Sequence, residues 1–436
     1  MTFDGMASSD DGSVETVDSF KTTLYDMQKS RRKLVDDLLH CEHAKAEDIE
    51  ALRSTHSLLT DMRTSDYQRM LASTSQRFSV NLKDEIFGLE KDIVFLEGIQ
   101  KNGMTGDVFT RVDLPKILAP YHPVSEAAFN AELEETIAFL TRLADIPEGT
   151  PKVAFITDWD GTMKNYCSQY ATNLQPVYSA VAMARYAHEC RLCAVLTAGP
   201  LRGPGILDLT ALPIDGDVVF SGSWGREWWM NGRRLKKNED ILEEQDDALT
   251  RFSDSVRELV GEGRFSQFAL VGSGVQKKVD RLTLGVQTVC NQVDTELSTT
   301  YQDSIQELMH RADPNKQHLK YDGHNKLEVE VCIKSSDGTI WDKGNGVEVL
   351  LTKTGKNLDE GRVLIAGDTF SDLPMLKYAV EHNPEGTYAL FVGLNDTLKE
   401  EVRSMVGDSS RVCFIACPDI FHAALSRILP AQEEVD

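Results

Sequence analysis

The sequence lacks the features that would place the chain in a membrane or send it through a secretory route. It contains no run of about 18 apolar residues, so no transmembrane helix is expected. The first segment, Met1–Ser13, is polar and acidic, and it has neither the basic nor the apolar part of a signal peptide. We therefore expect a cytoplasmic protein that binds no membrane.

Cysteine is sparse, and its spacing indicates no disulfide framework. Eight of the 436 residues are cysteines, and most lie in apolar runs, as expected for reduced side chains in a cytosolic core. Cys190 and Cys193 form a C-x-x-C pair, but no second Cys or His pair follows at the spacing of a zinc finger. Simple burial is therefore the favoured interpretation, and a redox or zinc role is the alternative.

Positive charge is also scarce. The chain has 46 Lys and Arg residues against 69 Asp and Glu residues, which gives a formal net charge of −23. Such an excess repels nucleic acid and anionic membranes, so no nucleic-acid partner is expected. An anionic substrate would need a local concentration of Lys or Arg.

The length of 436 residues predicts two or three domains.

The N-terminal quarter of the chain has a helical pattern and carries no catalytic motif. Residues 1–14 are small, polar and acidic, and we expect them to be disordered. Apolar residues then recur at three-four spacing over Val17–Leu38, Ile49–Met62 and Leu82–Leu96, with Arg31 interrupting the first stripe and Gly103 as a plausible stop. The pattern predicts a helical bundle or short coiled coil over residues 15–104, either self-contained or serving a protein partner or self-association.

A connector over residues 105–150 carries several prolines and one predicted helix at Ser125–Leu143. After it, the sequence pattern becomes that of an α/β domain. Short β-rich runs separated by helical stretches predict a parallel, helix-covered, Rossmann-like sheet. The core strands expected are Val153–Thr157, Leu192–Thr197, Val218–Ser221, Arg362–Ala366, Tyr388–Val392 and Val412–Ala416. We assign the catalytic core to residues 151–226 and 338–436. An inserted α+β cap domain is assigned to residues 227–337, with strands at Phe268–Val271, Arg281–Thr288 and Leu327–Ile333.

The first of these strands runs directly into two aspartates. Asp158 and Asp160 follow the apolar run Val153–Thr157, and Gly161 and Thr162 come next. In open α/β sheets ligands bind beyond the carboxyl ends of the strands, so both carboxylates are expected at that site. One aspartate can attack phosphorus, and a second can move the proton of the leaving alcohol. A calcium loop is the alternative, but the residues after Thr162 do not continue its ligand pattern.

This D-x-D-G-T segment resembles the first motif of the haloacid dehalogenase superfamily, and three further motifs follow in the superfamily's order. Thr197 ends an apolar strand, Lys343 precedes a helical stretch, and Asp368 and Asp372 form a G-D-x-x-x-D segment. The resemblance implies that Asp158 is the nucleophile and Asp160 the general acid and base. It also implies that Thr197 donates a hydrogen bond to the phosphoryl group and that Lys343 neutralises the negative charge. It further implies a Mg²⁺ ion held by Asp158, the Asp160 backbone carbonyl and Asp368, with Asp372 either as an additional ligand or behind the ligands.

Within that superfamily, the inserted segment is similar to the cap of trehalose-phosphate phosphatases, including those found in nematodes. Phe220–Gly225 resembles the family's G-S-H-G entry, with Trp224 in place of His. Gln276 with Lys278, and Lys326 with Glu330, resemble the family's V-E-x-K and K-x-x-x-E segments, although Gln276 replaces Glu and Gln287 replaces Arg. Residues two or four apart on a strand share a face, so each pair is expected to point into one cleft and read sugar hydroxyls.

The function expected from these motifs is hydrolysis of trehalose 6-phosphate. Another sugar-phosphate phosphatase or mutase of the superfamily is the first alternative. A helical scaffold with a vestigial phosphatase domain is the second, and the complete set of motif residues argues against it.

Overall fold

The computed structural model describes nine stretches of the chain. The predicted tail over residues 1–14, Gly103 and the predicted boundary at residues 337 and 338 lie outside them. The described residues are 15–61, 66–72, 77–102, 107–166, 168–261, 263–288, 293–323, 325–334 and 341–431. In these ranges, no helix has both the length and the apolar character needed to cross a membrane.

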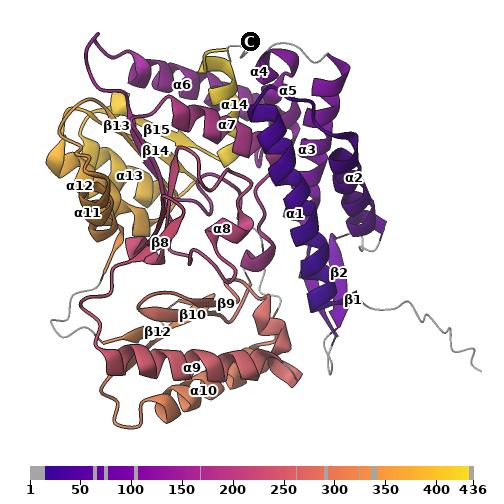
Figure 1. Ribbon diagram of the computed structural model, residues 1–436, viewed down its shortest axis with the longest axis vertical. Helices are drawn as coiled ribbons and strands as arrows, with labels where there is room; N and C mark the ends of the chain where they lie inside the picture. Colours follow the sequence, from indigo (N-terminus) through magenta and orange to yellow (C-terminus); the bar gives the residue numbers. More distant parts are fainter. Residues whose placement is uncertain are drawn as a thin grey trace, which may run out of the picture.

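The centre of the molecule is a sheet with the strand order β15-β14-β13-β4-β5-β6-β7-β8 (Figure 1). Its strands from β15 to β6 are parallel, as the α/β pattern predicts. Most of their residues are buried, as expected for a sheet covered by helices on both faces. The parallel strands are β4 (Ala154–Thr157), β5 (Leu192–Leu196), β6 (Val218–Gly222), β13 (Val363–Gly367), β14 (Thr387–Val392) and β15 (Val412–Ile415).

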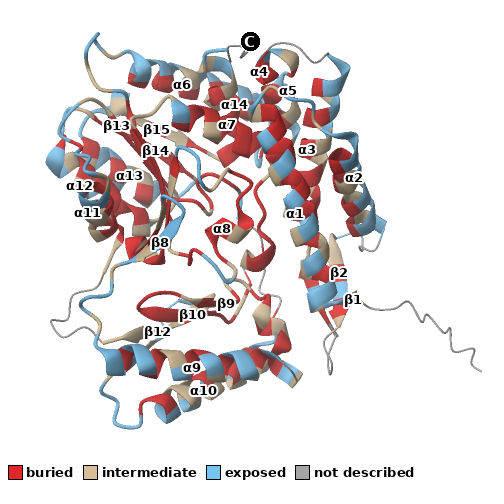
Figure 2. Cartoon of the chain, viewed as in Figure 1, coloured by how far each residue is buried: buried red, intermediate tan, exposed pale blue. Residues whose placement is uncertain are grey.

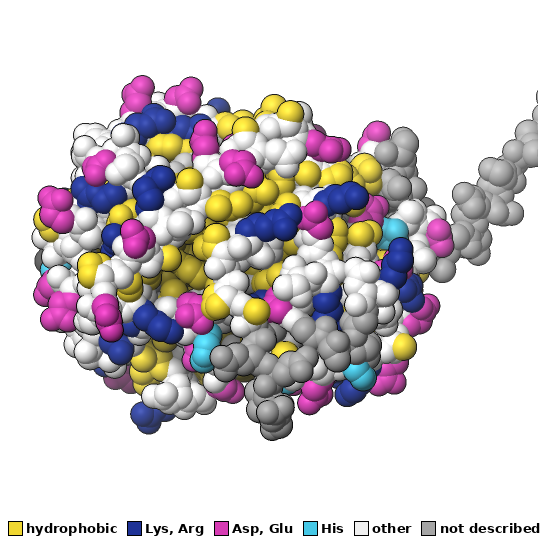
Figure 3. All heavy atoms as spheres, turned by 90° about the horizontal axis from the view of Figure 1, so that it is seen from above, with side chains coloured by type: hydrophobic (Ala, Val, Ile, Leu, Met, Phe, Trp, Pro, Cys, Tyr) yellow, Lys and Arg dark blue, Asp and Glu magenta, His cyan; other side chains and the backbone are white. Residues whose placement is uncertain are grey.

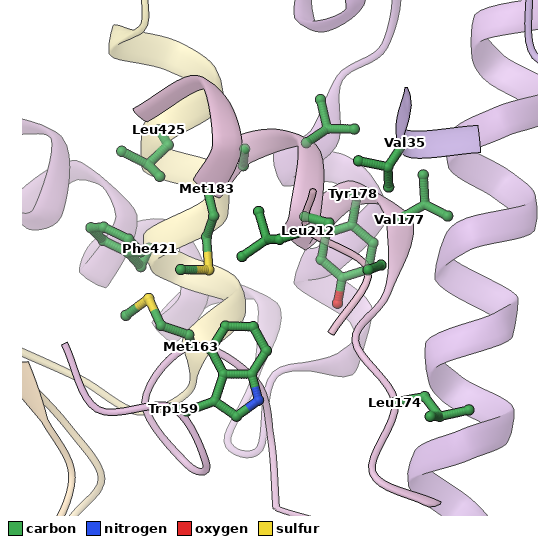
Figure 4. Packing of buried hydrophobic residues seen from close by; sticks show 14 of the residues in the cluster. Val35, Trp159, Met163, Leu174, Val177, Tyr178, Met183, Leu212, Phe421 and Leu425 are labelled. Carbon is green, nitrogen blue, oxygen red and sulfur yellow. The ribbon is translucent and has the colours of Figure 1, made fainter. Parts of the chain in front are cut away.

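Helices cover both faces of this sheet, and alternate strand residues enter two separate apolar clusters. Phe155 on β4 belongs to one cluster and its neighbour Ile156 to the other. Figure 4 shows Trp159, which lies between Asp158 and Asp160 in sequence, and Met163 packed near Met183 and Phe421 in the first cluster. The covering helices are α6 (Glu126–Ala144), α7 (Val177–His188) and α14 (Pro418–Ile428) on one face, and α11 (Lys343–Thr354), α12 (Leu373–His382) and α13 (Asp396–Val406) on the other.

The predicted start of the cap at residue 227 is wrong. Strands β7 (Glu227–Met230) and β8 (Arg233–Lys236) extend the core sheet as an antiparallel hairpin on β6. An Asn231-Gly232 turn, with both residues at positive φ, closes the hairpin, and Trp228 is buried beneath it. The chain therefore leaves the core only after Lys236, about ten residues later than the sequence pattern indicated.

The cap has one helical layer against one sheet, ordered β11-β12-β10-β9. Phe268–Val271 is not the strand that its apolar character suggested. Gly263–Ala269 is a 3-10 helix, and Phe268 stacks on Tyr301 of α10 at 3.9 Å between ring centroids. The cap elements are α9 (Glu243–Gly261), α10 (Thr295–Ala312), β9 (Val275–Lys277), β10 (Arg281–Gly285), β11 (Leu319–Asp322) and β12 (Glu328–Ile333).

The N-terminal part has the three predicted helices, with a small sheet added at one end. Its helices are α1 (Val17–Leu39), α2 (Ala46–Asp61) and α3 (Lys83–Lys101), and its strands are β1 (Glu15–Thr16), β2 (Gln68–Ala72) and β3 (Arg77–Asn81). Arg31, which interrupts the apolar stripe, is buried on α1 and pairs with Asp92 of α3 at 2.8 Å. The interruption is therefore an internal ion pair between two helices of the bundle.

The bundle packs against the catalytic core along one side (Figure 1). Arg32 of α1 donates to the backbone carbonyls of Leu207, Asp208 and Thr210, and Lys91 of α3 pairs with Asp419 of α14 at 2.8 Å. Buried residues line the facing sides of α1, α3 and the core (Figure 2). The predicted connector packs on the core, because its helix α6 contacts α14 and β15. Two short helices, α4 (Val108–Arg111) and α5 (Leu114–Leu118), precede α6.

Charged side chains of both signs are interspersed on the face seen from above in Figure 3, over the connector helices. The formal net charge of −23 is thus not gathered into a single acidic area on that face.

Candidate active site

The candidate active site lies where β4, β5 and β13 end. The Asp158 amide donates to the carbonyl of Ala366 at 2.9 Å, which continues the pairing of β4 with β13. The carboxylates of Asp158 and Asp368 therefore emerge from adjacent strand ends, and Thr197 emerges from the third. Parallel strands place their carboxyl ends on one edge of the sheet, so motifs more than 200 residues apart converge there.

Lys343 is the positive charge at the centre of this edge. Its Nζ atom lies 2.5 Å from Asp158 Oδ1 and 2.6 Å from Asp372 Oδ1, and its side chain is 1% exposed. The local sequence explains the position, because Asp342 caps the start of α11 by accepting from the amides of Gly344 and Asn345. Burial alone lowers the pKa of Lys343, but Asp158 and Asp372 outweigh burial and raise it, so the ammonium group stays charged.

Three carboxylates form a group that suits a divalent cation. Asp158, Asp368 and Asp372 each offer an oxygen within 4.8 Å of the others. Burial raises the pKa of Asp158 despite the opposing effect of Lys343, and burial followed by repulsion from Asp158 and Asp372 raises that of Asp368. One lysine thus leaves this cluster short of positive charge. Hard oxygen donors with excess negative charge are the setting that Mg²⁺ prefers, so the residues fit the ion.

The carboxylates are also held by hydroxyl and amide donors. Thr162 Oγ1 lies 3.2 Å from both Asp158 Oδ2 and Asp368 Oδ1 and bridges the two. Asp372 Oδ2 accepts from the amides of Asp368 at 3.0 Å and Thr369 at 2.9 Å. Asp372 is therefore engaged through both oxygens. Thr162 belongs to the first motif, which predicts no role for it, and its position four residues after Asp158 is the signal that identifies it.

Asp160 is held separately from the three-carboxylate group. Its Oδ1 atom accepts from Asn173 Nδ2 at 3.1 Å and lies 3.3 Å from Lys164 Nζ. Lys164 is 4% exposed and closes the turn that carries the motif, since the Gly161 amide donates to its carbonyl at 2.8 Å. Sequence reasoning missed both partners. Lys164 follows the motif by two residues and was a detectable candidate, whereas nothing in the pattern distinguished Asn173.

Thr197 is buried at the end of β5, with 2% of its surface exposed. Its Oγ1 atom accepts from the amide of Gly199 at 3.1 Å, and its carbonyl accepts from the amide of Trp224 at 3.1 Å. The hydroxyl group accepts in the bond from Gly199 and still has its own hydrogen to donate. This geometry suits a hydroxyl group that donates a hydrogen bond to the phosphoryl group, which is the role that the second motif implies.

In the cap, the structure brings three of the four predicted residues together. Glu330 on β12 accepts from Lys278 at 3.4 Å, from Arg281 at 3.0 Å and from Thr283 at 2.6 Å. Gln276 lies opposite Thr283 on the neighbouring strand β9 and is 4% exposed. Burial raises the pKa of Glu330, but Lys278 and Arg281 outweigh burial and lower it to about 2. Arg281 is a member of this group that the sequence reasoning did not select.

Lys326 does not share the predicted strand face with Glu330. Strand β12 begins at Glu328, so Lys326 lies in the exposed turn before it. The period-two argument fails there because Asn325 accepts from the amide of Leu327 and turns the chain ahead of the strand.

Trp224 connects the cap group to the catalytic edge. Its ring centroid lies 5.9 Å from Lys278 Nζ, 5.6 Å from Arg281 Cζ and 5.9 Å from Lys343 Nζ. Beside it, the Val279 amide of the cap donates to Ser223 Oγ of the core at 3.2 Å. The polar cap cluster thus lies over the strand ends, within reach of a group attached to a phosphate bound there.

The site combines an aspartate at the end of β4, a lysine at the start of α11 and an acidic group under an inserted cap. These features define a phosphatase of the haloacid dehalogenase superfamily. Two family models match the chain. "Trehalose-6-phosphate phosphatase, C-terminal" matches residues 155–421, and "Trehalose-6-phosphate phosphatase N-terminal helical bundle domain" matches residues 16–110.

Curated relatives agree along nearly the whole chain. A trehalose-phosphatase of Brugia malayi is 51% identical over 96% of this chain and 87% of its own length. Trehalose-phosphatases of Caenorhabditis elegans and Caenorhabditis briggsae are 48% and 49% identical, over 95% of this chain and 96% and 97% of theirs. The chain therefore belongs to the trehalose-6-phosphate phosphatase family.

Proposed function

We propose that this protein hydrolyses trehalose 6-phosphate to trehalose and phosphate, with Asp158 as the nucleophile and Mg²⁺ as the cofactor. The observation that carries the proposal is the contact of Asp158 with Lys343 at 2.5 Å, inside a group of three carboxylates at the sheet edge. Asp158, Asp368 and Asp372, with the backbone carbonyl of Asp160, would hold the ion. When bound, Mg²⁺ would offset the charge of the phosphate and of the attacking carboxylate.

The residues of the chain then act in two steps. The Asp158 carboxylate attacks phosphorus, the bond from phosphorus to the sugar oxygen breaks, and Asp160 gives its proton to that oxygen. Water next attacks phosphorus, Asp160 takes a proton from it, and the bond to Asp158 breaks to release phosphate. Thr197 donates to the phosphoryl oxygens, and Lys343 stabilises their charge throughout.

Substrate selection falls to the cap, because the sheet edge contacts the phosphate that all sugar phosphates share. We assign sugar contacts to Gln276, Lys278, Lys326 and Glu330. Lys278 and Glu330 support this assignment by lying in the cluster next to Trp224, and Lys326 rests on family resemblance alone. Amide, ammonium and carboxylate groups bind sugar hydroxyls, and a site built on them rejects analogues that leave them unpaired.

The test is phosphate release from a panel of sugar phosphates in the presence of Mg²⁺. We expect trehalose 6-phosphate to give the highest kcat/KM, with glucose 6-phosphate well below it. A preference for glucose 6-phosphate would overturn the trehalose assignment and leave another sugar-phosphate phosphatase. Transfer of phosphate between sugars would indicate a mutase. Absence of turnover with all substrates would favour a scaffold with a vestigial catalytic domain.

A further inference from the structure

The Asp160 carboxylate is held by Lys164 and Asn173. Both contact the same carboxylate oxygen, Oδ1, at 3.3 Å and 3.1 Å. Lys164 Nζ also donates to the backbone carbonyl of Asn173, so the two residues are tied to each other. This arrangement fixes the rotation of the Asp160 carboxyl group and leaves Oδ2 as the oxygen for proton transfer.

The segment that carries Asn173 is tied in turn to the N-terminal bundle. Thr172 Oγ1 donates to Glu85 Oε1 of α3 at 2.8 Å, and Thr172 is fully buried. Glu85 is itself 9% exposed, and among the described residues its second oxygen has no hydrogen-bond partner. The contacts thus lead from Glu85 of α3 through Thr172 and its neighbour Asn173 to Asp160, the proposed general acid and base. Lys164 contacts Asp160 as well.

Ala171 and Leu174 of this segment pack into the buried core, and a cavity borders the segment toward α3. This cavity of about 340 Å³ lies between α3 and the loop after the catalytic motif. Its lining includes Glu85 and Gly88 from the bundle, and Lys164, Thr172 and Asn173 from the core. The hydrogen bond from Thr172 to Glu85 spans the contact between this segment and α3, so we expect it to contribute to the position of the loop.

We propose that Lys164 and Asn173 are positioning residues for Asp160, and that Glu85 of the N-terminal bundle holds them in place through Thr172. The inference rests on the proposed function, because that function gives Asp160 its proton-transfer role. A general acid must lie within hydrogen-bond reach of the atom it serves, and small misplacements cost large factors in rate. The bundle thereby contributes to the chemistry although it holds no catalytic motif.

The two chemical steps depend on Asp160 differently, which gives a specific readout. In the first step, p-nitrophenyl phosphate needs little help from an acid, because nitrophenolate is a good leaving group. In the second step, the phosphoryl group on Asp158 is removed only if Asp160 takes a proton from water. Impaired positioning should therefore allow one rapid turnover and slow those that follow.

The experiment is rapid-mixing kinetics on the full-length enzyme with Mg²⁺ and p-nitrophenyl phosphate, comparing Lys164→Gln and Thr172→Val with the wild type. We expect a nitrophenolate burst close to one per active site, followed by a steady rate at least tenfold below that of the wild type. Thr172→Ser keeps the donating hydroxyl and should recover most of the rate that Thr172→Val loses. Thr172→Val is nearly isosteric and protects the test against misfolding of the lysine variant.

Thr55→Val is the matched control. Thr55 is also a buried threonine of the assembly, but its hydroxyl donates to Ala51 within α2, the helix away from the core (Figure 1). It should keep wild-type kinetics. Burst amplitude and steady rate falling in proportion would mean a general loss of folded enzyme and would overturn the proposal, as would steady rates within twofold of the wild type.

Asp160→Asn in the same assay separates this inference from the proposed function. If Asp160→Asn gives a burst and a slow steady rate while Lys164→Gln and Thr172→Val do not, the positioning inference fails alone. If Asp160→Asn behaves like the wild type, the acid–base assignment itself fails.

Discussion

Replacing Glu330 by Gln tests how the cap selects its substrate. Glu330 is 21% exposed in its side chain and holds Lys278 and Arg281 in place at 3.4 Å and 3.0 Å. These cations lower its pKa from 4.5 to about 2. That shift corresponds to about 3 kcal/mol of favourable interaction with the ionised form. Gln keeps an acceptor but loses the charge, so part of this energy is lost; Lys278 then loses its pairing with a carboxylate, whereas Arg281 keeps Asp280.

We expect Glu330→Gln to lower kcat/KM for trehalose 6-phosphate by at least about tenfold, equivalent to ~1.4 kcal/mol of transition-state stabilisation. The assay is phosphate release under conditions where rate is proportional to substrate concentration. p-Nitrophenyl phosphate, which has no sugar to be read, should lose much less activity with the same variant. Glu307→Gln is the control, because Glu307 carries the same charge on α10 but is 72% exposed.

Equal losses with both substrates would refute this reasoning. They would mean that Glu330 supports the cap fold or the phosphate site and does not read the sugar. A loss confined to trehalose 6-phosphate, with thermal stability close to that of the control, would support it.

Three further predictions follow from the catalytic edge and the bundle. Asp158→Asn should abolish turnover by several orders of magnitude while preserving the circular dichroism spectrum, and near-normal phosphate release would contradict the nucleophile assignment. EDTA should silence the enzyme and Mg²⁺ should restore it, whereas Ca²⁺ should fail to support activity because its larger, looser coordination misplaces the carboxylate; full activity in excess chelator would exclude the metal site. Burial raises the pKa of Glu85 from 4.5 to about 8, so the folded state binds more protons than the unfolded state between these values and its stability falls as pH rises through this window. Glu85→Gln should remove this pH dependence of stability. The free energy of unfolding should rise near the upper end of the window by a few kcal/mol (about 1.4 per pH unit). Urea unfolding across the window measures it, and a pH dependence unchanged from the wild type would show that the reasoning is wrong.

Local patterns in the sequence predicted the catalytic edge well. Apolar runs such as Val153–Thr157 end in chemically distinctive residues, and each parallel strand delivers its last residues to the same edge. Asp158, Thr197 and Asp368 could therefore be expected together although they are distant in sequence, whereas Lys343 comes from the start of helix α11. The three long N-terminal helices were predicted for a similar reason, since each repeats one apolar stripe over many residues.

Features that depend on contacts between distant segments were not predicted. The sequence of Glu227–Lys236 does not distinguish the cap from the core. Only the hairpin pairing with β6 assigns this segment to the core sheet. Phe268 is apolar enough for a strand, but stacking on Tyr301 places it in a 3-10 helix. Glu85 looked like one more polar residue on an amphipathic helix, and its burial against Thr172 arises only when the bundle meets the core.

The two parts added to the core contact different members of the catalytic group, and this difference separates their effects. The cap reaches Lys343 through the ring of Trp224, which lies beside both Lys278 and Lys343. The bundle reaches Asp160 through Thr172 and Asn173. Changes in the cap should therefore depend on the identity of the leaving group. Changes at the contact between bundle and core should slow the removal of phosphate from Asp158 for all substrates, because that step is common to them. A partner that binds the bundle and moves α3 would act on this common step and leave substrate preference unchanged.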